Sequence, residues 1–452
     1  MNFQGKKIGI LGLGEENAAV IEYLLTRGAE ITICDQKSRE ELGAYLDKAK
    51  VVDNLQFNLG SDYLENLKNF DIIFRTPGLP YLHPKIQEAK SAGVEISSQI
   101  KLFFDECPSP ILGVTGTKGK GTTTTLIGEI LKTSGKQVFV GGNIGTPPIS
   151  FLDKLNKESA VVLELSSFQL QDLQKSPHIA VVLDIKADHL DYHSGHQEYV
   201  ESKKTIVEHQ TDQDFAVINA DYFTSLEFAS GTAAKVYFFS RRKSVDLGAF
   251  VLKNKIVLRS EDKEQEIIEI SSIQLRGEHN LENICAAATA SFLSGAPIDS
   301  IKMAISNFKG LEHRLEFIRE ADGVKYYNDS FSTTPDTTIA AIRSFSEPII
   351  LLVGGSEKNA NYDELGKAIG ESSVKKIIPI GLTGRRIIEA IGESNIDIIG
   401  EIQPFESAIS IAKKSASTGD VVLLSPASAS FDRFKNYKER GNNFRNLVEK
   451  TI

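Results

Sequence analysis

Short apolar runs recur along the whole chain and alternate with segments of helical periodicity, which is the pattern of parallel α/β folds. At 452 residues the chain is too long for one core, so more than one sheet is expected. The runs fall into three sets, at residues 7–11, 30–34 and 71–75, at residues 110–114, 137–140, 160–165 and 179–183, and at residues 348–353, 374–380, 396–400 and 420–424. The sequence therefore predicts an α/β protein of three domains, each with its own sheet.

Two segments mark the predicted domain boundaries. "DECPSP" at residues 105–110 has the prolines and polar residues of a linker, and "NFKGLEHRLEF" at residues 307–317 precedes the third set of strands. We predict a Rossmann-like N-terminal domain over residues 1–107, a central P-loop domain over 108–311 and a Rossmann-like C-terminal domain over 312–452. Late in the central domain, "GAFVLKNKIVL" alternates like a β hairpin that turns near Lys253 and Asn254, and this indicates a β insertion.

A glycine-rich loop, "TGTKGKGTTTT", follows the first strand of the second set. In such a strand–turn–helix unit, backbone N–H groups surround an anion, and Lys120 would contact the outer phosphates of a nucleotide. The spacing is shorter than in a standard P-loop, and Gly121 stands where a Ser or Thr hydroxyl is usual. A glycine-rich turn with a solvent-facing lysine is the alternative. The predicted ATP-binding residues of the loop are Gly116, Thr117, Lys118, Gly119, Lys120, Gly121 and Thr122.

Candidate ligands for a magnesium ion follow the neighbouring strands. Because Gly121 has no hydroxyl, either Thr122 or a later threonine supplies one, or the metal relies on other groups. Glu164 ends a buried strand, where a lone carboxylate is costly unless it is hydrogen-bonded or metal-bound. "DHLDYH" brings Asp188, His189 and Asp191 after the next strand, and a hard divalent cation bridging phosphates accepts such carboxylate oxygens.

Composition narrows the class of protein. The formal net charge of −9 argues against nucleic-acid binding through a broad basic surface. No apolar run approaches the roughly 18 residues of a membrane span, and the N-terminus runs directly into a strand pattern. The three cysteines are widely spaced, which indicates reduced, mostly buried thiols. A cytoplasmic enzyme is the expectation.

Several separate motifs occur in a fixed order along the chain: "GTKGKGTT", "GGNIG", "ELSSFQL", "DHLDYH", a lysine after Tyr199, "GEHNLEN", "EHR", "NDS" and "LSPASASFDRFKNYKERG". Together they resemble the Mur ligase family, the ATP-dependent amide-forming enzymes of bacterial cell-wall precursor synthesis, over nearly the whole chain. "ELSSFQL" and the long C-terminal run look most like the members that add D-glutamate to UDP-N-acetylmuramoyl-L-alanine. The resemblance implies ATP and Mg²⁺ as cofactors, an acyl-phosphate intermediate and a monomer.

The resemblance also implies roles for individual residues in the ATP site. Lys203 matches the position that carries a carbamate and serves as an extra metal ligand, although it or the adjacent Lys204 could be a surface lysine. Asn280 in "GEHN" matches a residue that reads adenine, and Arg314 and Asp329 match residues that close over ATP. The implied catalytic residues are Lys120, His189 and Lys203, and the implied metal ligands are Thr122, Glu164, His189 and Lys203.

In this family the N-terminal domain binds the uridine diphosphate. Gly12-Leu13-Gly14 begins a dinucleotide fingerprint, but Asn17 occupies the third glycine position, and an NAD enzyme would explain nothing after residue 105. Glu16 and its neighbour would repel a diphosphate, so their side chains are expected to point away. The implied sugar-nucleotide contacts are Gly14, Glu15, Asp35, Thr76, Pro77, Gly78 and Asn143, although Asp35 could equally cap a loop.

The implied amino-acid contacts are Thr333, Lys358, Ser430 and Tyr437, where a cation and hydroxyls suit a dicarboxylate. Phe331 departs from the family pattern, since many of these enzymes have lysine there, and the substitution removes a positive charge. The choice between D- and L-glutamate therefore stays open. The alternatives are a folylpolyglutamate-type synthase, which would lack the uridine domain although many such enzymes share the glycine at position 121, and a nucleotide-binding regulator without activity.

Overall fold

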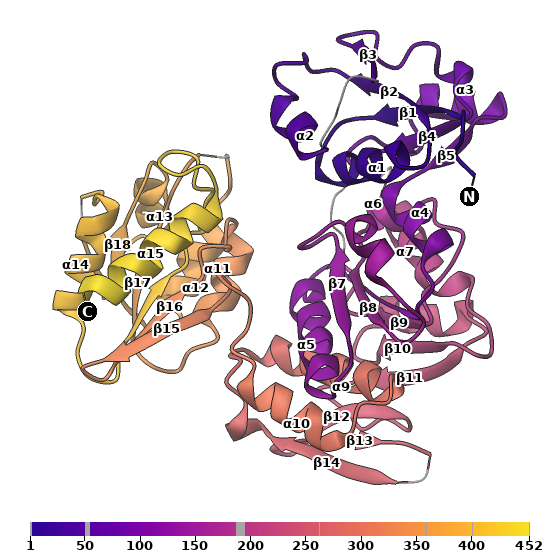
Figure 1. Ribbon diagram of the computed structural model, residues 1–452. Helices are drawn as coiled ribbons and strands as arrows, with labels where there is room; N and C mark the ends of the chain where they lie inside the picture. Colours follow the sequence, from indigo (N-terminus) through magenta and orange to yellow (C-terminus); the bar gives the residue numbers. More distant parts are fainter. Residues whose placement is uncertain are drawn as a thin grey trace. The chain divides into compact units, whose positions relative to one another are not determined.

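The computed structural model describes residues 2–49, 55–186, 195–261, 263–357, 359–399 and 401–451 (Figure 1). The chain forms two compact units. The first comprises Met1–Ser272 and Leu281–Ser306, and the second comprises Ile273–Asn280 and Asn307–Ile452. The first unit contains the two sheets predicted for the N-terminal and central domains, and the second contains the third sheet.

The N-terminal sheet is parallel, with the strand order β3-β2-β1-β4-β5. Its strands are β1 (Lys7–Leu11), β2 (Glu30–Asp35), β3 (Gln56–Leu59), β4 (Ile72–Arg75) and β5 (Glu95–Ser97). Its helices are α1 (Glu15–Leu25), α2 (Gly43–Lys48), α3 (Pro84–Ser91) and the short 3₁₀ turn η1 (Leu67–Asn69). The register pairs Leu11 of β1 with Arg75 of β4, so the loops that follow these two strands start side by side.

The central sheet has six parallel strands in the order β11-β10-β9-β6-β8-β7. These are β6 (Ile111–Thr115), β7 (Val138–Gly142), β8 (Ala160–Glu164), β9 (Ile179–Val182), β10 (Phe215–Asn219) and β11 (Lys235–Phe239). The segments around them are α5 (Lys120–Thr133), η2 (Pro148–Lys154), α6 (Ser167–Leu170), α7 (His196–Glu208), α8 (Phe223–Leu226), η3 (Glu227–Gly231), η4 (Ile270–Ser272), α9 (Glu278–Leu293) and α10 (Ile298–Asn307).

The predicted β insertion is confirmed as an antiparallel sheet in the order β12-β13-β14. β12 (Gly248–Leu252) and β13 (Lys255–Arg259) form the predicted hairpin, with Lys253 in a left-handed conformation at the turn (φ 56°). β14 (Glu264–Glu269) is the outer strand, and it carries Glu264, Glu266 and Glu269. Arg259 and Lys255 of β13 pair with Glu264 and Glu266 across the sheet.

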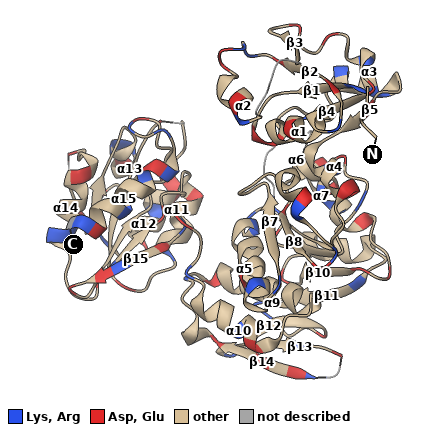
Figure 2. Ribbon diagram, in the orientation of Figure 1, with Lys and Arg blue, Asp and Glu red and all other residues tan. Residues whose placement is uncertain are grey.

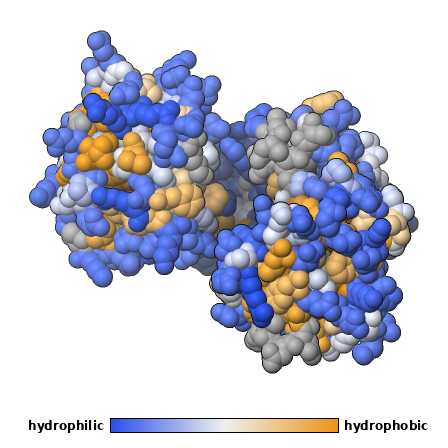
Figure 3. Space-filling model, turned by 90° about the horizontal axis from the view of Figure 1, so that it is seen from above, coloured by the Kyte–Doolittle hydropathy of each residue, from blue (hydrophilic) through white to orange (hydrophobic). Residues whose placement is uncertain are grey.

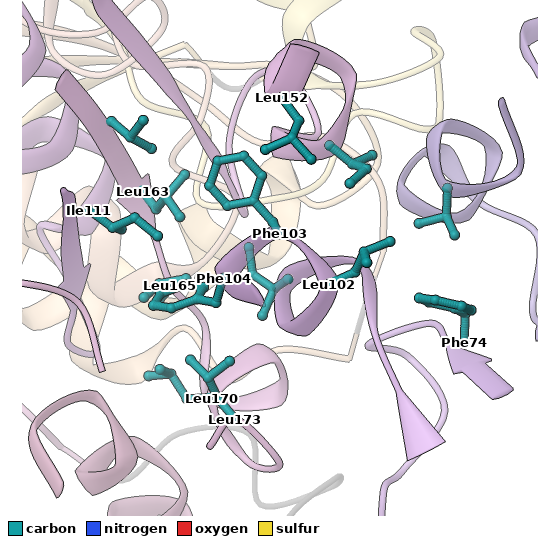
Figure 4. Packing of buried hydrophobic residues seen from close by; sticks show 14 of the residues in the cluster. Phe74, Leu102, Phe103, Phe104, Ile111, Leu152, Leu163, Leu165, Leu170 and Leu173 are labelled. Carbon is teal, nitrogen blue, oxygen red and sulfur yellow. The ribbon is translucent and has the colours of Figure 1, made fainter. Parts of the chain in front are cut away.

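One hydrophobic cluster joins the two sheets of the first unit, with α4 (Gln99–Glu106) between them. In Figure 4 the side chains of Phe103 and Phe104 lie among residues of the central domain such as Ile111 and Leu163, while Leu102 lies on the side toward Phe74 of β4. Phe103 also meets Phe151 edge to face, with 5.6 Å between the ring centroids. The "DECPSP" segment therefore begins in the last turn of a helix that belongs to a shared core.

In the second unit, the sheet order is β15-β16-β20-β17-β18-β19, with β15 antiparallel to its neighbour. The strands are β15 (Glu316–Ala321), β16 (Val324–Asn328), β17 (Ile349–Val353), β18 (Val374–Pro379), β19 (Asp397–Ile398) and β20 (Val421–Leu424). The helices are α11 (Pro335–Ile342), α12 (Asp363–Gly370), α13 (Gly384–Ile391), α14 (Phe405–Ser415) and α15 (Tyr437–Thr451). Apolar clusters cover both faces of this sheet.

The surface carries charges of both signs, with lysine and arginine interspersed among aspartate and glutamate (Figure 2). The face seen in Figure 3 is mostly hydrophilic. Large apolar side chains that are nevertheless exposed include Phe223, Leu382 and Phe431. Within the described ranges, no helix has both the length and the apolar character needed to cross a bilayer.

The thiols are free, as predicted. Burial raises the pKa of Cys34 to about 12 and also raises the pKa of Cys107 and Cys285. All three side chains are therefore protonated near neutral pH.

Candidate functional site

The glycine-rich loop folds around its own lysine. Lys120 begins α5, and its Nζ donates to the carbonyl oxygens of Gly116 and Thr117, each at 3.0 Å. Gly119 precedes the helix with φ 86°, and a β-carbon there would lie 2.2 Å from Oδ1 of Asn283. The loop thus needs glycine at this position, and it brings an ammonium group to the start of a fourteen-residue helix, where anions are favoured.

The threonines after Gly121 differ in what their hydroxyl groups can do. Thr123 donates to Oδ1 of Asn283 at 3.3 Å, and Thr124 is fully buried. Thr122 lies in the first turn of α5 and keeps a small exposed fraction. Thr125, the fourth threonine, is also partly exposed but lies further along α5, so Thr122 is the partly exposed threonine nearest to the glycine-rich loop.

Glu164 stands at the end of β8, next to the strand that leads into the glycine-rich loop. Its side chain is 4% exposed, and its Oε1 accepts a hydrogen bond from Nδ2 of Asn143 at 2.8 Å. A β-carbon on Gly142 would lie 2.1 Å from the carbonyl oxygen of Glu164, so this glycine (φ 100°) is required for the close approach. Asn143 was expected to contact the sugar nucleotide, and in the structure it holds this carboxylate.

One oxygen of the buried Glu164 carboxylate is held by the amide of Asn143, and carboxylate oxygen is a ligand that a hard divalent cation accepts. The described part of the chain contains no group of three or more His, Cys, Asp or Glu side chains placed to hold a metal. Asp188, His189 and Asp191, which were predicted to help, lie outside the described residues.

Lys203 of α7 contacts the glycine-rich loop. The residue is 1% exposed, and its Nζ lies 3.3 Å from both Thr115 Oγ1 and the carbonyl oxygen of Gly116. Lys204 instead pairs with Glu201 on the surface at 2.6 Å. Of the two adjacent lysines considered for the carbamate, only Lys203 lies at the loop.

The first expected sugar-nucleotide loop follows β1. Asp35 accepts hydrogen bonds from the backbone N–H groups of Leu13 at 2.7 Å and Lys37 at 2.9 Å, so it caps loops in this structure. The amide of Asn17 donates to the carbonyl oxygen of Gly12 at 2.7 Å, which gives the residue at the missing glycine position a local structural role. Glu15 is exposed and pairs with a lysine of α2, as expected for a side chain that points away.

Glu16 does not point into solvent. Its carboxylate accepts a hydrogen bond from Nε2 of Gln169 at 2.8 Å, and Gln169 in turn accepts from the N–H of Ser166 at 3.1 Å. Burial raises the pKa of Glu16 to about 7, partly offset by the Gln169 hydrogen bond and the charge of Arg75. The first helix of the N-terminal sheet is thereby tied to α6, which begins three residues after Glu164.

The second expected sugar-nucleotide loop, with Thr76, Pro77 and Gly78, is tied to the same short helix through Arg75. This arginine pairs with Asp172 at 3.1 Å and donates to the carbonyl oxygen of Phe168 at 3.2 Å. It also donates to the carbonyl oxygen of Leu79 at 2.8 Å, on the far side of the loop. The sequence analysis did not predict the contacts of Glu16 or those of Arg75. The only sequence signal for the Arg75 contacts is the arginine at the end of the apolar strand "DIIFR".

The raised pKa of Glu16 predicts a pH dependence of stability. Because the folded protein holds this proton more tightly than the unfolded chain does, its contribution is fully present below about pH 4.5 and is lost as the pH rises through about 7. Glu16→Gln should remain neutral, so we expect it to gain about 1–3 kcal/mol over the wild type between pH 5 and 8 in urea unfolding. Glu15→Gln, at the exposed neighbour, is the control. Parallel pH profiles for Glu16→Gln and the wild type would contradict the assignment.

In the second unit, Asp329 and Arg314 lie on neighbouring loops. Asp329 is buried and accepts hydrogen bonds from the N–H of Leu315 at 3.1 Å and the hydroxyl of Ser425 at 2.7 Å. Burial raises the pKa of Asp329 to about 6. The Cζ atom of Arg314 lies 3.7 Å from the centroid of the Phe331 ring. The loop that carries Arg314 is thus hydrogen-bonded to Asp329, and the contacts of both residues with ATP stay predictions.

The expected amino-acid residues fall near the same loops. Tyr437 begins α15, and its ring meets Phe331 edge to face at 5.0 Å. Ser430 is buried and Thr333 is half-buried, while Lys358 lies outside the described residues.

Arg440 joins the segments that carry these residues, and sequence reasoning missed it. Its buried guanidinium donates to the carbonyl oxygens of Ser330 at 2.9 Å, Ser428 at 3.1 Å and Ala429 at 3.1 Å. Burial lowers the pKa of Arg440 to about 10. The residue therefore stays charged near neutral pH and crosslinks the turn after β16 to the loop after β20.

Asn280 lies near the start of α9, and its amide donates to the carbonyl oxygen of Arg276 at 2.6 Å. Arg276 itself makes two hydrogen bonds to Glu347, at 2.8 and 2.9 Å. The expected adenine-reading residue is thus held on an anchored turn.

Three family models match the chain, in the order of the predicted domains. They describe a "Mur ligase MurD-like, N-terminal domain" at residues 6–98, a "Mur ligase middle domain" at residues 114–291, and a "Mur ligase, glutamate ligase domain" at residues 313–428. The matched segments support a three-domain architecture.

Relatives and solved structures agree with these matches. A protein of Symbiobacterium thermophilum named UDP-N-acetylmuramoylalanine--D-glutamate ligase is 43% identical over 451 residues, covering 98% of each chain. A protein of the same name from Acetivibrio thermocellus is 42% identical over 452 residues, covering 98% of this chain and 96% of the relative. The fold is shared with the MurF ligase of Thermotoga maritima in complex with ADP, at a TM-score of 0.60 and 19% identity over 99% of this chain and 96% of that one. It is also shared with the UDP-N-acetylmuramate-alanine ligase MurC of the same organism, at a TM-score of 0.59 and 16% identity over 99% of this chain and 100% of that one.

Proposed function

The chain belongs to the Mur ligase family, and from this premise we propose that it adds D-glutamate to UDP-N-acetylmuramoyl-L-alanine with hydrolysis of ATP. The observation that carries the proposal is the meeting of Lys120 and Lys203 at one glycine-rich loop, next to the strand that ends in Glu164. The names of the full-length relatives supply the substrate class.

The proposed ligase reaction has two steps, and these determine the roles of the site residues. The carboxylate of the sugar nucleotide attacks the γ-phosphate of ATP, the bond to the β-phosphate oxygen breaks, and ADP leaves an acyl phosphate. The amine of glutamate then attacks the carbonyl carbon of the acyl phosphate, inorganic phosphate leaves, and the nitrogen loses a proton to give the amide. Both steps concentrate negative charge, so positioning and electrostatic stabilisation dominate catalysis. Lys120 supplies positive charge to the outer phosphates from the start of α5, where the helix dipole adds to the attraction.

We assign the metal site to Glu164, Thr122, His189 and a carbamate on Lys203. A bound Mg²⁺ would neutralise charge on the phosphates. The amide of Asn143 orients the Glu164 carboxylate, and the hydroxyl of Thr122 substitutes for the one that Gly121 lacks.

The remaining contacts follow the same assignment. The loops after β1 and β4 take the uridine diphosphate, Asn280, Arg314 and Asp329 contact ATP, and Thr333, Lys358, Ser430 and Tyr437 hold the glutamate. ATP and the nucleotide substrate are cytoplasmic metabolites, so we propose the cytoplasm as the compartment and a monomer as the working form.

The test is phosphate release from ATP and Mg²⁺ with UDP-N-acetylmuramoyl-L-alanine, with D-glutamate, L-glutamate and other amino acids supplied separately. We expect release that depends on D-glutamate and on the sugar nucleotide together, and reactions that omit either one are the controls. Phosphate release with L-glutamate but not with D-glutamate would show that the roles given to the amino-acid-binding residues are wrong. If no amino acid supports phosphate release, the proposed function is contradicted.

A further inference from the structure

Phe331 departs from the lysine that many family members have at this position, and it places an aromatic ring there. The Cζ atom of Arg314 lies 3.7 Å from the centroid of the Phe331 ring, a distance at which the guanidinium lies against the ring face. A cation therefore occupies the space over residue 331 although the side chain there is neutral.

The backbone around Arg314 is held for this contact. His313 and Leu315, on either side of it, both adopt left-handed conformations, with φ of 64° and 45°. Such strain in residues other than glycine persists only where the surroundings enforce it, and it concentrates at functional sites. The N–H of Phe331 donates to the carbonyl oxygen of His313 at 2.9 Å, and the N–H of Leu315 donates to Asp329 at 3.1 Å, so both ends of the loop are tied down.

A second ring packs against Phe331. Tyr437 meets Phe331 edge to face at 5.0 Å and meets His313 edge to face at 6.1 Å. Phe331 therefore contacts both the guanidinium of Arg314 and the ring of Tyr437. Since Tyr437 is among the residues proposed to hold glutamate, the stack connects that residue to an arginine proposed to contact ATP.

We propose that Phe331 is a positioning residue that orients the guanidinium of Arg314 for an anionic group of ATP. The aromatic face at position 331 limits the directions in which the guanidinium can point, and an aliphatic side chain there would not. This inference rests on the proposed function, because it takes Arg314 to be an ATP contact.

The test compares Phe331→Leu, which keeps an apolar side chain of similar reach but removes the ring face, with Phe331→Tyr, which restores the ring. We expect Phe331→Leu to raise KM for ATP by about 5- to 30-fold with a smaller change in kcat, and Phe331→Tyr to stay within about twofold of the wild type. We expect Phe331→Lys to be at least as impaired as Phe331→Leu. Wild-type kinetics for Phe331→Leu, or improved kinetics for Phe331→Lys, would overturn the proposal.

A second measurement separates positioning from general destabilisation and does not need turnover. The rise in unfolding temperature caused by Mg²⁺-ATP reports nucleotide binding directly. It should be smaller for Phe331→Leu than for the wild type, and this difference should largely disappear when both proteins also carry Arg314→Lys, because a lysine cannot stack in the same way. An equal loss in both backgrounds would show that Phe331 does not act through Arg314. If ATP shifts the wild type but no amino acid supports phosphate release, the amino-acid ligase assignment fails while the stack remains tested.

Discussion

Lys203→Ala should lower the rate of D-glutamate-dependent phosphate release by about 100-fold or more, the scale seen when a metal ligand or a charge-stabilising group is lost. The buried amine sits 3.3 Å from the carbonyl oxygen of Gly116, where a carbamate would present a carboxylate-like group to a metal at the phosphates. The measurement is kcat at saturating substrates.

Lys204→Ala is the matched control, because the side chain of Lys204 is partly exposed and pairs with Glu201 on the surface. It should keep near-normal activity. Added short-chain carboxylates should restore part of the activity of Lys203→Ala, since they can supply the missing oxygen ligands. Full activity of Lys203→Ala without added carboxylate would contradict a role for a carbamate on Lys203.

Arg75→Ala should cost about 3–5 kcal/mol of unfolding free energy, because it leaves the Asp172 carboxylate buried without its partner. The two side chains are 1% and 4% exposed. The loss also frees the carbonyl oxygens of Leu79 and Phe168, so we expect a raised KM for the sugar nucleotide as well. Urea unfolding and substrate titration measure the two effects.

The chain offers a close control for this prediction. Arg27 and Asp153 also join the N-terminal and central sheets at 3.1 Å, but their side chains are 32% and 76% exposed. Arg27→Ala should therefore cost only about 0–1 kcal/mol. The double variant Arg75→Met/Asp172→Leu removes both buried charges and should recover much of the lost stability. Equal costs for Arg75→Ala and Arg27→Ala would contradict the argument from burial.

The buried parallel strands were predictable because each is a short apolar run followed by a turn and a helix. β1 matches its predicted bounds, and β6, β8 and β17 begin or end within one residue of theirs. The β15–β16 hairpin was not foreseen, since β15 is only partly buried and has no clear apolar run. Its turn at Asp322 and Gly323, both left-handed, is a recognisable hairpin signal that could have revealed it.

Some of the candidate site residues were predictable from the sequence and others were not. Lys120, Glu164 and Lys203 lie in sequence motifs, and the structure brings the glycine-rich loop, β8 and α7 together. The contacts made by Glu16, Arg75 and Arg440 could not be predicted from the sequence. They join residues that are more than 90 positions apart, and some of them are made to backbone carbonyl oxygens, which no pattern of side chains indicates.

The charged outer strand of the small antiparallel sheet has a consequence for how copies of this protein meet in solution. An unpaired edge is a template onto which a strand from another molecule can add, and this is a common route to aggregation. β14 carries Glu264, Glu266 and Glu269, so two such edges brought together would set carboxylates against carboxylates. The acidic outer strand therefore makes the addition of a like strand from another copy of this protein unfavourable.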